Sequence, residues 1–417
     1  MSIPFFSLDL NSSEILKVFQ SVILPFNKHN SKKKLTQILE ERFKNKNISL
    51  LPSARIGFYL TLKNLFKEGD ELIFSSMSFP LYVKIANQLN LKVRLVDVNI
   101  EDLNINYELI EQNINSNTKG IVATHLFGNP CEIDKIKKIC EKYKLKLIED
   151  CAQSFDSFHK GIETGNFGDV AIFSTSLLKI PTTLSGGILV TNNVDLNYKV
   201  DSWIEKNLNK ANIIYDVKLL IKVFLSILNS IPWIYSIISD KIFKTLNNHN
   251  PRIYRKILYS GMGMEEIVYN PLERNDLKKY QIEIGIKQIK KNKRMTEKRI
   301  SHSHFLNKGL FDEQNIRLIN CNSNSKGNYQ YYVIEVKKNA KNFFNNIFKN
   351  GIHVMEEDVW DCTNYGFKIE NPNDNFEQTK KSNPNLIRIQ NNSYLNKKLI
   401  NKILLEIKKN LNETGKF

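Results

Sequence analysis

The chain has 417 residues, 41% of them apolar, and a formal net charge of +17. This length is typical of two domains or of one large α/β domain with an appendage, and the apolar share is ample for a sizeable core. The five cysteines are scattered and lack C-x-x-C spacing, which argues against a disulfide framework or a zinc site and favours a reducing compartment. The lysines are spread along a chain rich in Asn and Ile, and no motif has the spacing of base-reading residues. We therefore attribute the charge to composition and expect no nucleic-acid partner.

The first part of the chain predicts helices and then a turn with the features of an anion site. The start lacks a basic stretch followed by an apolar one, so we expect no secretory signal. Residues 11–45 carry apolar side chains at helical spacing. A turn at Pro52-Ser53 opens an apolar helix expected over 56–66, which ends before Gly69. The free N–H groups of such a helix start suit a phosphate, although an ordinary loop-to-helix junction is the commoner case.

Short apolar strands then alternate with helical segments. We expect strands at 71–74, 93–98, 120–125, 145–149, 170–173 and 187–191, and a helix at 133–143. This alternation is typical of an α/β fold with a parallel or mostly parallel sheet that helices cover on both faces. Ligands bind such sheets beyond the carboxyl ends of the strands, where residues 76–79, 150–153 and 174–179 fall. No GxGxxG follows the first strand, which argues against a dinucleotide-binding domain.

The stretch from Lys146 to Val190 contains the residue types that a pyridoxal phosphate (PLP) site needs. An apolar strand ends at Asp150, and Lys179 follows the next strand. A carboxylate can keep the pyridine nitrogen protonated, and a lysine amine can bind the aldehyde. By themselves these two residues are weak evidence, because most lysines are solvated and most strand-end aspartates cap helices.

Residues 50–192 as a whole resemble the DegT/DnrJ/EryC1/StrS family, the sugar aminotransferases among the fold-type I (aspartate aminotransferase-like) PLP enzymes. The resemblance lies in three motifs that follow the family's order, GDELIFSSMSFPLYVKIANQLNLKVRLVDVNIEDLNIN, THLFGNPCEIDKIKKICEKYKLKLIEDCAQSF and FGDVAIFSTSLLK. It implies a mostly parallel sheet with helices on both faces, a smaller α+β C-terminal domain, and pyridoxal 5'-phosphate as the cofactor.

The resemblance also implies a role for each motif residue. Lys179 would be the catalytic residue that binds the cofactor aldehyde and later moves the proton. Asp150 would pair with the ring nitrogen, and Gln153 would lie near the phenolic oxygen. Phe79 would stack on the ring, and Ser174 would bind the phosphate. Taken alone, Phe79 could equally be a core residue and Ser174 a turn residue.

The chain departs from the family at two places that concern the phosphate. Ala54-Arg55 stand where most members have Gly-Thr, so Arg55 would supply a charged contact in place of a hydroxyl. Downstream, Gln281 and Gly285 fit the family's Asn-x-Arg…Gln…Gly helix, whereas Arg274 and Asp276 occupy the places of its Asn and Arg. In the family that asparagine reaches the cofactor phosphate across the dimer. Arg274 is therefore the candidate for this contact here.

A long apolar and aromatic insert separates the Gly-Gly strand from that helix. Its centre runs from Lys218 to Leu246 and is interrupted by Pro232, so it is a poor match to the roughly 20 apolar residues of a membrane span. Two amphipathic helices fit better. We leave open whether they pack on the protein body, cap the substrate cleft or dimer seam, or lie on a membrane surface.

The remainder of the chain resembles the family's smaller domain. We expect helices at 275–306 and 340–350 and strands at 331–336 and 351–354. The predicted domains are 1–268, which binds PLP and contains the insert at about 200–265, and 269–417. No metal site is expected, because the two-residue spacing of His302 and His304 on a helix puts them on different faces.

The expected function is transfer of an amino group from glutamate or glutamine to a nucleotide-linked keto sugar, in the biosynthesis of surface polysaccharide or another glycoconjugate. The family implies a homodimer. We expect a cytoplasmic location, at the inner face of the membrane if residues 218–246 bind it. The family's sugar dehydratases replace the lysine with histidine, so Lys179 argues against dehydration. The alternative is a non-catalytic or dehydratase-like protein of this fold on the membrane surface.

Overall fold

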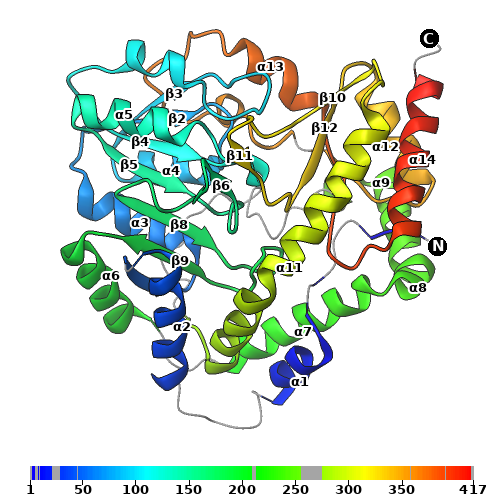
Figure 1. The fold of residues 1–417 in the computed structure, drawn as a ribbon, viewed down its shortest axis with the longest axis horizontal. Coiled ribbons are helices and arrows are strands. Elements are labelled where there is room, and N and C mark those ends of the chain that lie inside the picture. The colour runs from blue at the N-terminus through cyan, green and yellow to red at the C-terminus, as the bar shows by residue number, and fades with distance from the viewer. Residues whose placement is uncertain are drawn as a thin grey trace.

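A seven-stranded sheet with the order β1-β9-β8-β5-β4-β2-β3 organises the larger part of the chain (Figure 1). Its strands in the computed structural model are β1 (Asn47–Leu51), β2 (Glu71–Ser75), β3 (Lys92–Val96), β4 (Thr118–Thr124), β5 (Lys146–Asp150), β8 (Val170–Ser174) and β9 (Gly187–Thr191). Neighbouring strands are parallel except at β9, which runs antiparallel to both β1 and β8. The predicted α/β class with a mostly parallel sheet is therefore confirmed.

The structure describes all of the chain except residues 1, 5–7, 9, 21–28, 45, 209–212, 255–274, 357, 390 and 415–417. All five cysteines lie in the described part and are free.

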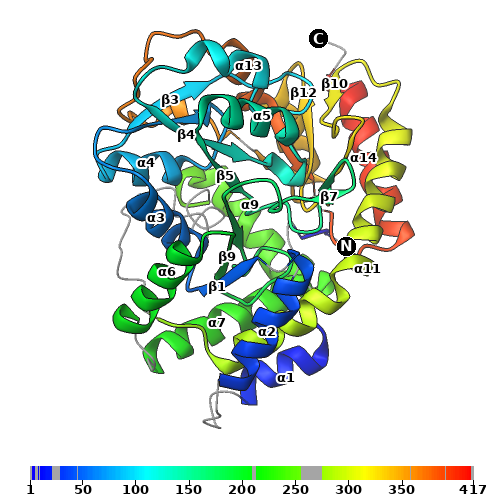
Figure 2. The ribbon, with the colours of Figure 1, turned by 60° about the vertical axis from the view of Figure 1, so that its left-hand side comes forward.

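Helices cover both faces of this sheet (Figure 2). One face carries α3 (Ala54–Leu65), α4 (Pro80–Gln88) and α6 (Val194–Asn207), and the other carries α2 (His29–Arg42) and α5 (Ile133–Tyr143). In β8 the side chain of Ile172 joins the first face, whereas Ala171 and Phe173 join the second. Both faces are thus apolar, as the burial of a parallel sheet requires.

Local sequence signals set where these helices begin and end. Ser53 caps α3, and its hydroxyl accepts a hydrogen bond from the N–H of Ile56 at 3.3 Å. Pro80 stands in the first turn of α4, where its missing N–H costs nothing. Lys144 ends α5 in the left-handed conformation, with φ of 55°.

The later part of the chain forms a four-stranded sheet with the order β10-β12-β14-β13, antiparallel at every pairing. Its elements are α11 (Lys279–Leu310), β10 (Ile316–Leu318), β12 (Tyr332–Val336), α12 (Ala340–Lys349), β13 (Met355–Glu356), α13 (Glu377–Ser382), β14 (Leu386–Ile389) and α14 (Lys397–Thr414). A small sheet of β11 (Ser325–Lys326), β6 (Phe158–His159) and β7 (Ile162–Glu163) joins this part to the segment after β5.

The insert forms helices that bend sharply around the region of Pro232. They are α7 (Ile213–Ser230), α8 (Pro232–Ile234), the π-helical turn η4 (Tyr235–Ser239) and α9 (Asp240–His249). The inner side of α7 packs on the protein body, since Leu219 and Val223 are buried beside Leu177 and Leu184. Within the described residues no single helix is long and apolar enough to cross a membrane. The pair Ile214–Ser230 and Tyr235–His249 reaches the length and composition of a span only when taken together, and it is bent by 93°.

Several predicted boundaries differ from the structure. The helical region predicted over residues 11–45 contains two helices in the described part, α1 (Ser12–Gln20) and α2. Strand β1 was not predicted, because NISLL has polar residues at alternate positions beside a turn and lacks an apolar run. The strand predicted at 351–354 is wrong in position, since the observed strand is β13. Chain segment 351–353 instead bonds to the N-terminus, through Ile3.

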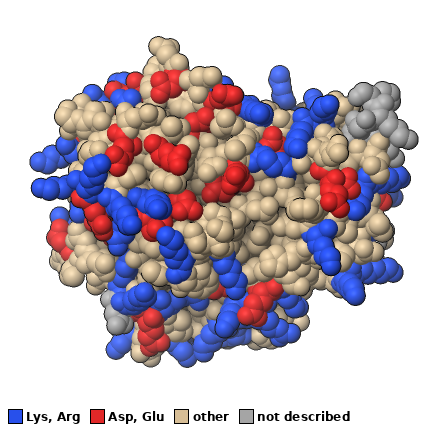
Figure 3. Space-filling model, turned by 45° about the horizontal axis from the view of Figure 1, so that its top comes forward, with Lys and Arg blue, Asp and Glu red and all other residues tan. Residues whose placement is uncertain are grey.

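Charged residues of both signs are distributed over the surface. On the face seen in Figure 3, Lys and Arg side chains are scattered among Asp and Glu rather than gathered in one field. This agrees with the interpretation of the net charge as a property of composition.

Candidate active site

The carboxyl ends of β2, β4 and β5 meet at one edge of the parallel sheet, and hydrogen-bonding side chains connect them. The hydroxyls of Ser78 and Thr124 lie 3.0 Å apart, and the Thr124 hydroxyl donates to Oδ2 of Asp150 at 3.4 Å. Asp150 is only 4% exposed. Burial raises the pKa of its carboxyl. The hydrogen bond from the N–H of Ala152 and the charge of Lys179 lower this pKa, but burial outweighs them. The acid and the lysine are therefore electrostatic neighbours.

Lys179 lies on a tightly closed loop between β8 and β9. The loop is closed by Thr175 and Thr183, whose hydroxyl oxygens are 2.6 Å apart and whose backbones are joined by a 2.8 Å hydrogen bond. Within it, the N–H of Lys179 donates to the carbonyl of Ser176 at 2.9 Å. The loop thus holds the backbone of the lysine in one position.

The first turns of α11 hold this loop from outside. The amide of Gln281 donates to the carbonyl of Thr183 at 3.2 Å and to the hydroxyl of Ser185 at 3.1 Å. A Cβ on Gly285 would lie 2.7 Å from Cγ2 of Thr183, closer than such atoms normally approach. The predicted Gln…Gly pattern therefore marks the place where a helix packs directly on the lysine loop.

Residues of the C-terminal part reach the lysine, which sequence reasoning did not foresee. The amine of Lys179 donates to the hydroxyl of Tyr331 at 3.3 Å, and the amide of Gln330 donates to the carbonyl of Leu178 at 3.3 Å. The guanidinium of Arg388 lies 4.3 Å from the centre of the Tyr331 ring. The available signal was the polar cluster NYQY at the start of a strand, which points to no particular chemistry.

Gln153 lies in the same region, and hydrogen bonds from Phe127 and Asn328 hold it in place. Its side-chain oxygen accepts from the N–H of Phe127 at 2.8 Å, and its carbonyl accepts from the amide of Asn328 at 2.8 Å. A Cβ on Gly128, which has φ of 87°, would lie 2.2 Å from the Asn328 side-chain oxygen. The contact between the two parts of the chain is therefore close here as well.

The predicted aromatic and hydroxyl residues lie around the same edge. Phe79 immediately precedes α4. Its ring packs edge-on against Tyr82, with ring centres 5.4 Å apart, and tilted against Trp360 at 6.4 Å. Ser174 ends β8 and is half-buried, and its hydroxyl donates to that of Ser176 at 3.4 Å.

The start of α3 brings Ala54 and Arg55 to this edge. Burial raises the pKa of Tyr82 most, the charge of Asp150 raises it further, and the charge of Arg55 lowers it, so the three side chains are close. Ala54 packs directly on β9, because a Cβ on Gly187 would lie 2.6 Å from its backbone nitrogen. Arg274 lies outside the described residues.

The carboxylate next to Asp150 has a structural task. Glu149 is fully buried and accepts hydrogen bonds from the N–H groups of Gly165, Phe167 and Gly168 at 2.6–2.8 Å and from His125 Nε2 at 3.2 Å. Burial by itself would raise the pKa of Glu149, but these hydrogen bonds outweigh it and lower the pKa. The two adjacent acids therefore differ in role.

Two side-chain groups in the described chain have the types of metal ligands, namely His125, Glu149 and Cys151, and Glu132, Asp134 and His159. In each group a carboxylate already accepts hydrogen bonds from protein donors. Glu149 accepts from the four donors just named, and Asp134 accepts from Lys160 at 2.6 Å and from His159 at 2.7 Å. We therefore assign a metal centre to neither group.

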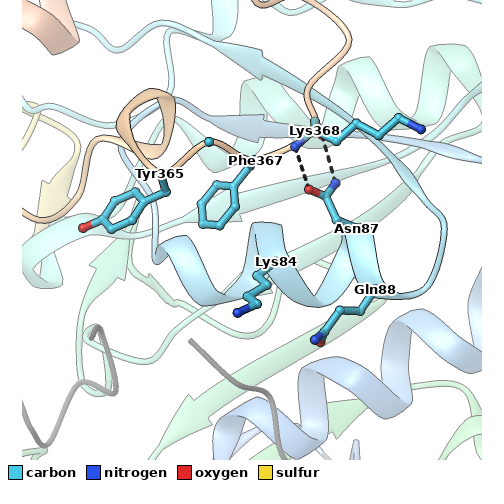
Figure 4. Close-up of a pocket in the computed structure, with 7 residues that line it drawn as sticks. Lys84, Asn87, Gln88, Tyr365, Phe367 and Lys368 are labelled. Carbon is cyan, nitrogen blue, oxygen red and sulfur yellow. Dashed lines mark hydrogen bonds between the residues drawn. The ribbon is translucent and has the colours of Figure 1, made fainter. Parts of the chain in front are cut away.

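A surface cavity of about 370 Å³ lies apart from this set of residues. It is lined by the second half of α4 and by residues 365–368, and Asn87 is hydrogen-bonded to both backbone groups of Lys368 (Figure 4). None of the predicted site residues lines it.

The whole chain superimposes on solved aminotransferases. With TlmJ of Streptoalloteichus hindustanus the TM-score is 0.76 at 15% identity, over 99% of this chain and 100% of the other. With Spr1654 of Streptococcus pneumoniae in its PMP form the TM-score is 0.76 at 17% identity, over 99% of this chain and 100% of the other. At these identities the likeness establishes the fold.

Part of the sequence also matches a family model. Residues 27–211 match the model of the DegT/DnrJ/EryC1/StrS aminotransferase family, which confirms the resemblance found in the motifs. The GDP-perosamine synthase of Escherichia coli O157:H7 is 33% identical over 172 residues, which are 40% of this chain and 47% of that protein. The match thus spans less than half the length of the curated relatives.

Proposed function

We propose that the protein is a PLP-dependent aminotransferase that transfers an amino group from an amino acid to a nucleotide-linked keto sugar. One observation carries the proposal. Lys179 lies on a rigid loop at the carboxyl edge of the sheet, as an electrostatic neighbour of the buried Asp150, within the segment that matches an aminotransferase family.

The residues present fit the cofactor. PLP needs an acid for its ring nitrogen, an amine for its aldehyde and donors for its phosphate. Asp150 is the buried acid, and Lys179 is the amine. Ser174 and the first turn of α3 offer hydroxyl and N–H donors, to which Arg55 adds a positive charge. Spr1654, whose fold this chain shares, has been solved in both PLP and PMP forms, which supports the same cofactor here.

Each residue then has a definite task. When bound, PLP would supply an electron-withdrawing ring that acidifies the carbon next to the transferred nitrogen. Asp150 would keep the ring nitrogen protonated, and Phe79 would pack against the ring. Lys179 would hold the cofactor and, once the substrate amine displaced it, would accept and return the proton at that carbon. Tyr331 would orient the lysine amine through its hydroxyl, and Gln153 would lie near the phenolic oxygen.

The substrate class is inferred from a relative that matches part of the chain. That relative is named a GDP-perosamine synthase, which supports a nucleotide-linked sugar as amino acceptor. The positive net charge suits a diphosphate-bearing substrate. We propose glutamate or glutamine as donor and a role in surface polysaccharide or glycoconjugate biosynthesis, in the cytoplasm.

We propose further that the protein is a homodimer, as the family resemblance implies, with Arg274 contacting the phosphate across the seam. The division into a PLP-binding domain of residues 1–268 and a smaller domain of residues 269–417 is likewise a proposal. The two separate sheets support it.

The test is the visible absorption spectrum of the purified protein with added PLP. We expect the band of a lysine-bound cofactor, bleached by glutamate, in the wild type and in Lys84→Ala, a lysine control from the cavity of Figure 4. We expect no such band in Lys179→Ala. A band that persists in Lys179→Ala would refute the assignment of the lysine, and a wild type without a band would refute the proposed function.

A further inference from the structure

The insert presents an apolar face to the outside of the molecule. We call this the outer insert face. It comprises Ile214, Val217, Ile221, Phe224 and Leu225 on α7 and Trp233, Ile237, Ile238 and Ile242 on α8, η4 and α9. Each of these side chains is between 42% and 69% exposed. Scattered exposed apolar residues are ordinary, but a set this large on consecutive helices marks an interaction surface.

This face is not the side by which the insert holds to the protein. The opposite side of α7 is buried through Leu219, Val223 and Ser226, and Tyr235 anchors the following turn with 1% exposure. Helix α7 is therefore apolar on both sides, and its outer side stays largely exposed in the described structure. Helix α1 lies next to α7, and its Phe19 packs edge-on against Phe224 at 6.5 Å. Figure 1 shows α7 and α1 together at the lower edge of the molecule.

The exposed charged side chains on the helices that carry the outer insert face are lysines. Lys218, Lys222 and Lys241 are exposed on the same helices. The two acids of these helices are turned to protein partners instead. Asp216 contacts the amine of Lys278 at 3.5 Å, and Asp240 contacts His353 at 2.6 Å.

We propose that the outer insert face lies on an anionic lipid surface, with the insert helices in the plane of the interface. Apolar side chains on one face, lysines beside them and an exposed tryptophan at the bend are the features of an interfacial helix. The 93° bend suits helices that lie on a membrane rather than cross it. A second copy of the chain fits less well, because a two-fold contact through this face would bring its own lysines together.

The proposal is independent of the proposed catalytic function, because none of its residues belongs to the candidate active site. Flotation of the full-length protein with vesicles of phosphatidylcholine alone, or mixed with phosphatidylglycerol, tests it. We expect the protein to float with the mixed vesicles and to remain in solution with phosphatidylcholine alone.

Two variants separate the contributions of apolar contact and charge. Ile221→Ser combined with Leu225→Ser and Ile238→Ser should abolish flotation. Lys218→Glu combined with Lys222→Glu and Lys241→Glu should weaken binding at least roughly 100-fold, because loss of each lysine costs about fivefold and each glutamate adds repulsion. The control is Val194→Ser with Tyr198→Ser on α6, which removes two exposed apolar side chains elsewhere and should leave binding unchanged.

Either of two results would overturn the proposal. One is a wild-type protein that does not float with the anionic vesicles. The other is flotation that survives in both the serine and the glutamate variants. Sedimentation then identifies the other occupant, because a serine variant that is monomeric beside a dimeric wild type would make this face a subunit contact.

Discussion

Gly285 gives the sharpest test of how the lysine loop is held. In Gly285→Ala the new Cβ would lie 2.7 Å from Cγ2 of Thr183 and 3.5 Å from Cδ2 of Leu35, so only the threonine is in the way. Thr183 cannot rotate aside freely, since its hydroxyl is shared with Thr175 at 2.6 Å and lies 2.7 Å from the carbonyl of Ser185. Overpacking of this kind costs about 1–3 kcal/mol, whereas replacing a mid-helix glycine by alanine gains about 1 kcal/mol.

The expected result is a net loss of up to about 2 kcal/mol in the free energy of unfolding of Gly285→Ala. In a Thr183→Ser background Cγ2 is gone while the hydroxyl remains, so the same substitution should stabilise by up to about 1 kcal/mol. Urea unfolding of the four proteins gives the coupling between the two positions. Equal effects of Gly285→Ala in both backgrounds would refute the close packing of α11 on the loop. Because the loop carries Lys179, the single variant should also retain added PLP less well than the double variant.

Three further predictions concern single groups. Glu149→Gln should lower the free energy of unfolding by about 2–5 kcal/mol. The single amide oxygen of glutamine cannot accept from all four donors, so about two of them are left unpaired. An unchanged urea midpoint would contradict the structural role of Glu149. Tyr331→Phe should keep the cofactor band but slow its bleaching by glutamate roughly 10- to 100-fold. The reason is that a hydrogen bond to a charged group contributes about 1.5–3 kcal/mol. A bleaching rate equal to that of the wild type would exclude the orienting role of Tyr331. Asp134 has a folded-state pKa of about 2, because its bonds to Lys160 and His159 outweigh the opposing effect of burial. The folded state therefore favours the carboxylate, and its contribution is complete above about pH 4 and is lost as the pH falls through about 2. Urea unfolding at pH 5 and at pH 3 measures this. Between these two pH values the free energy of unfolding should fall less for Asp134→Asn than for the wild type.

The candidate site was predictable where its residues follow local strand patterns. Asp150 and Ser174 end apolar strands, and Lys179 lies in the loop after one of them, so alternation of strands and helices already places them at one edge of a parallel sheet. Tyr331 was not predictable in this way, because it lies 152 residues along the chain from Lys179, whose amine donates a hydrogen bond to its hydroxyl. No spacing rule connects residues that far apart.

The sequence by itself determined the α/β class, most of the strands and the acid and lysine motifs, because each depends on a period or motif within a short window. Only the tertiary structure decided that β9 runs against its neighbours, that Gln281 and Gly285 pack on the lysine loop, and that Tyr331 meets the lysine amine. It also decided which side of α7 is buried. An apolar helix carries the same pattern whether both sides are covered or one, and only its packing on the loop and α11 leaves the other side facing outward.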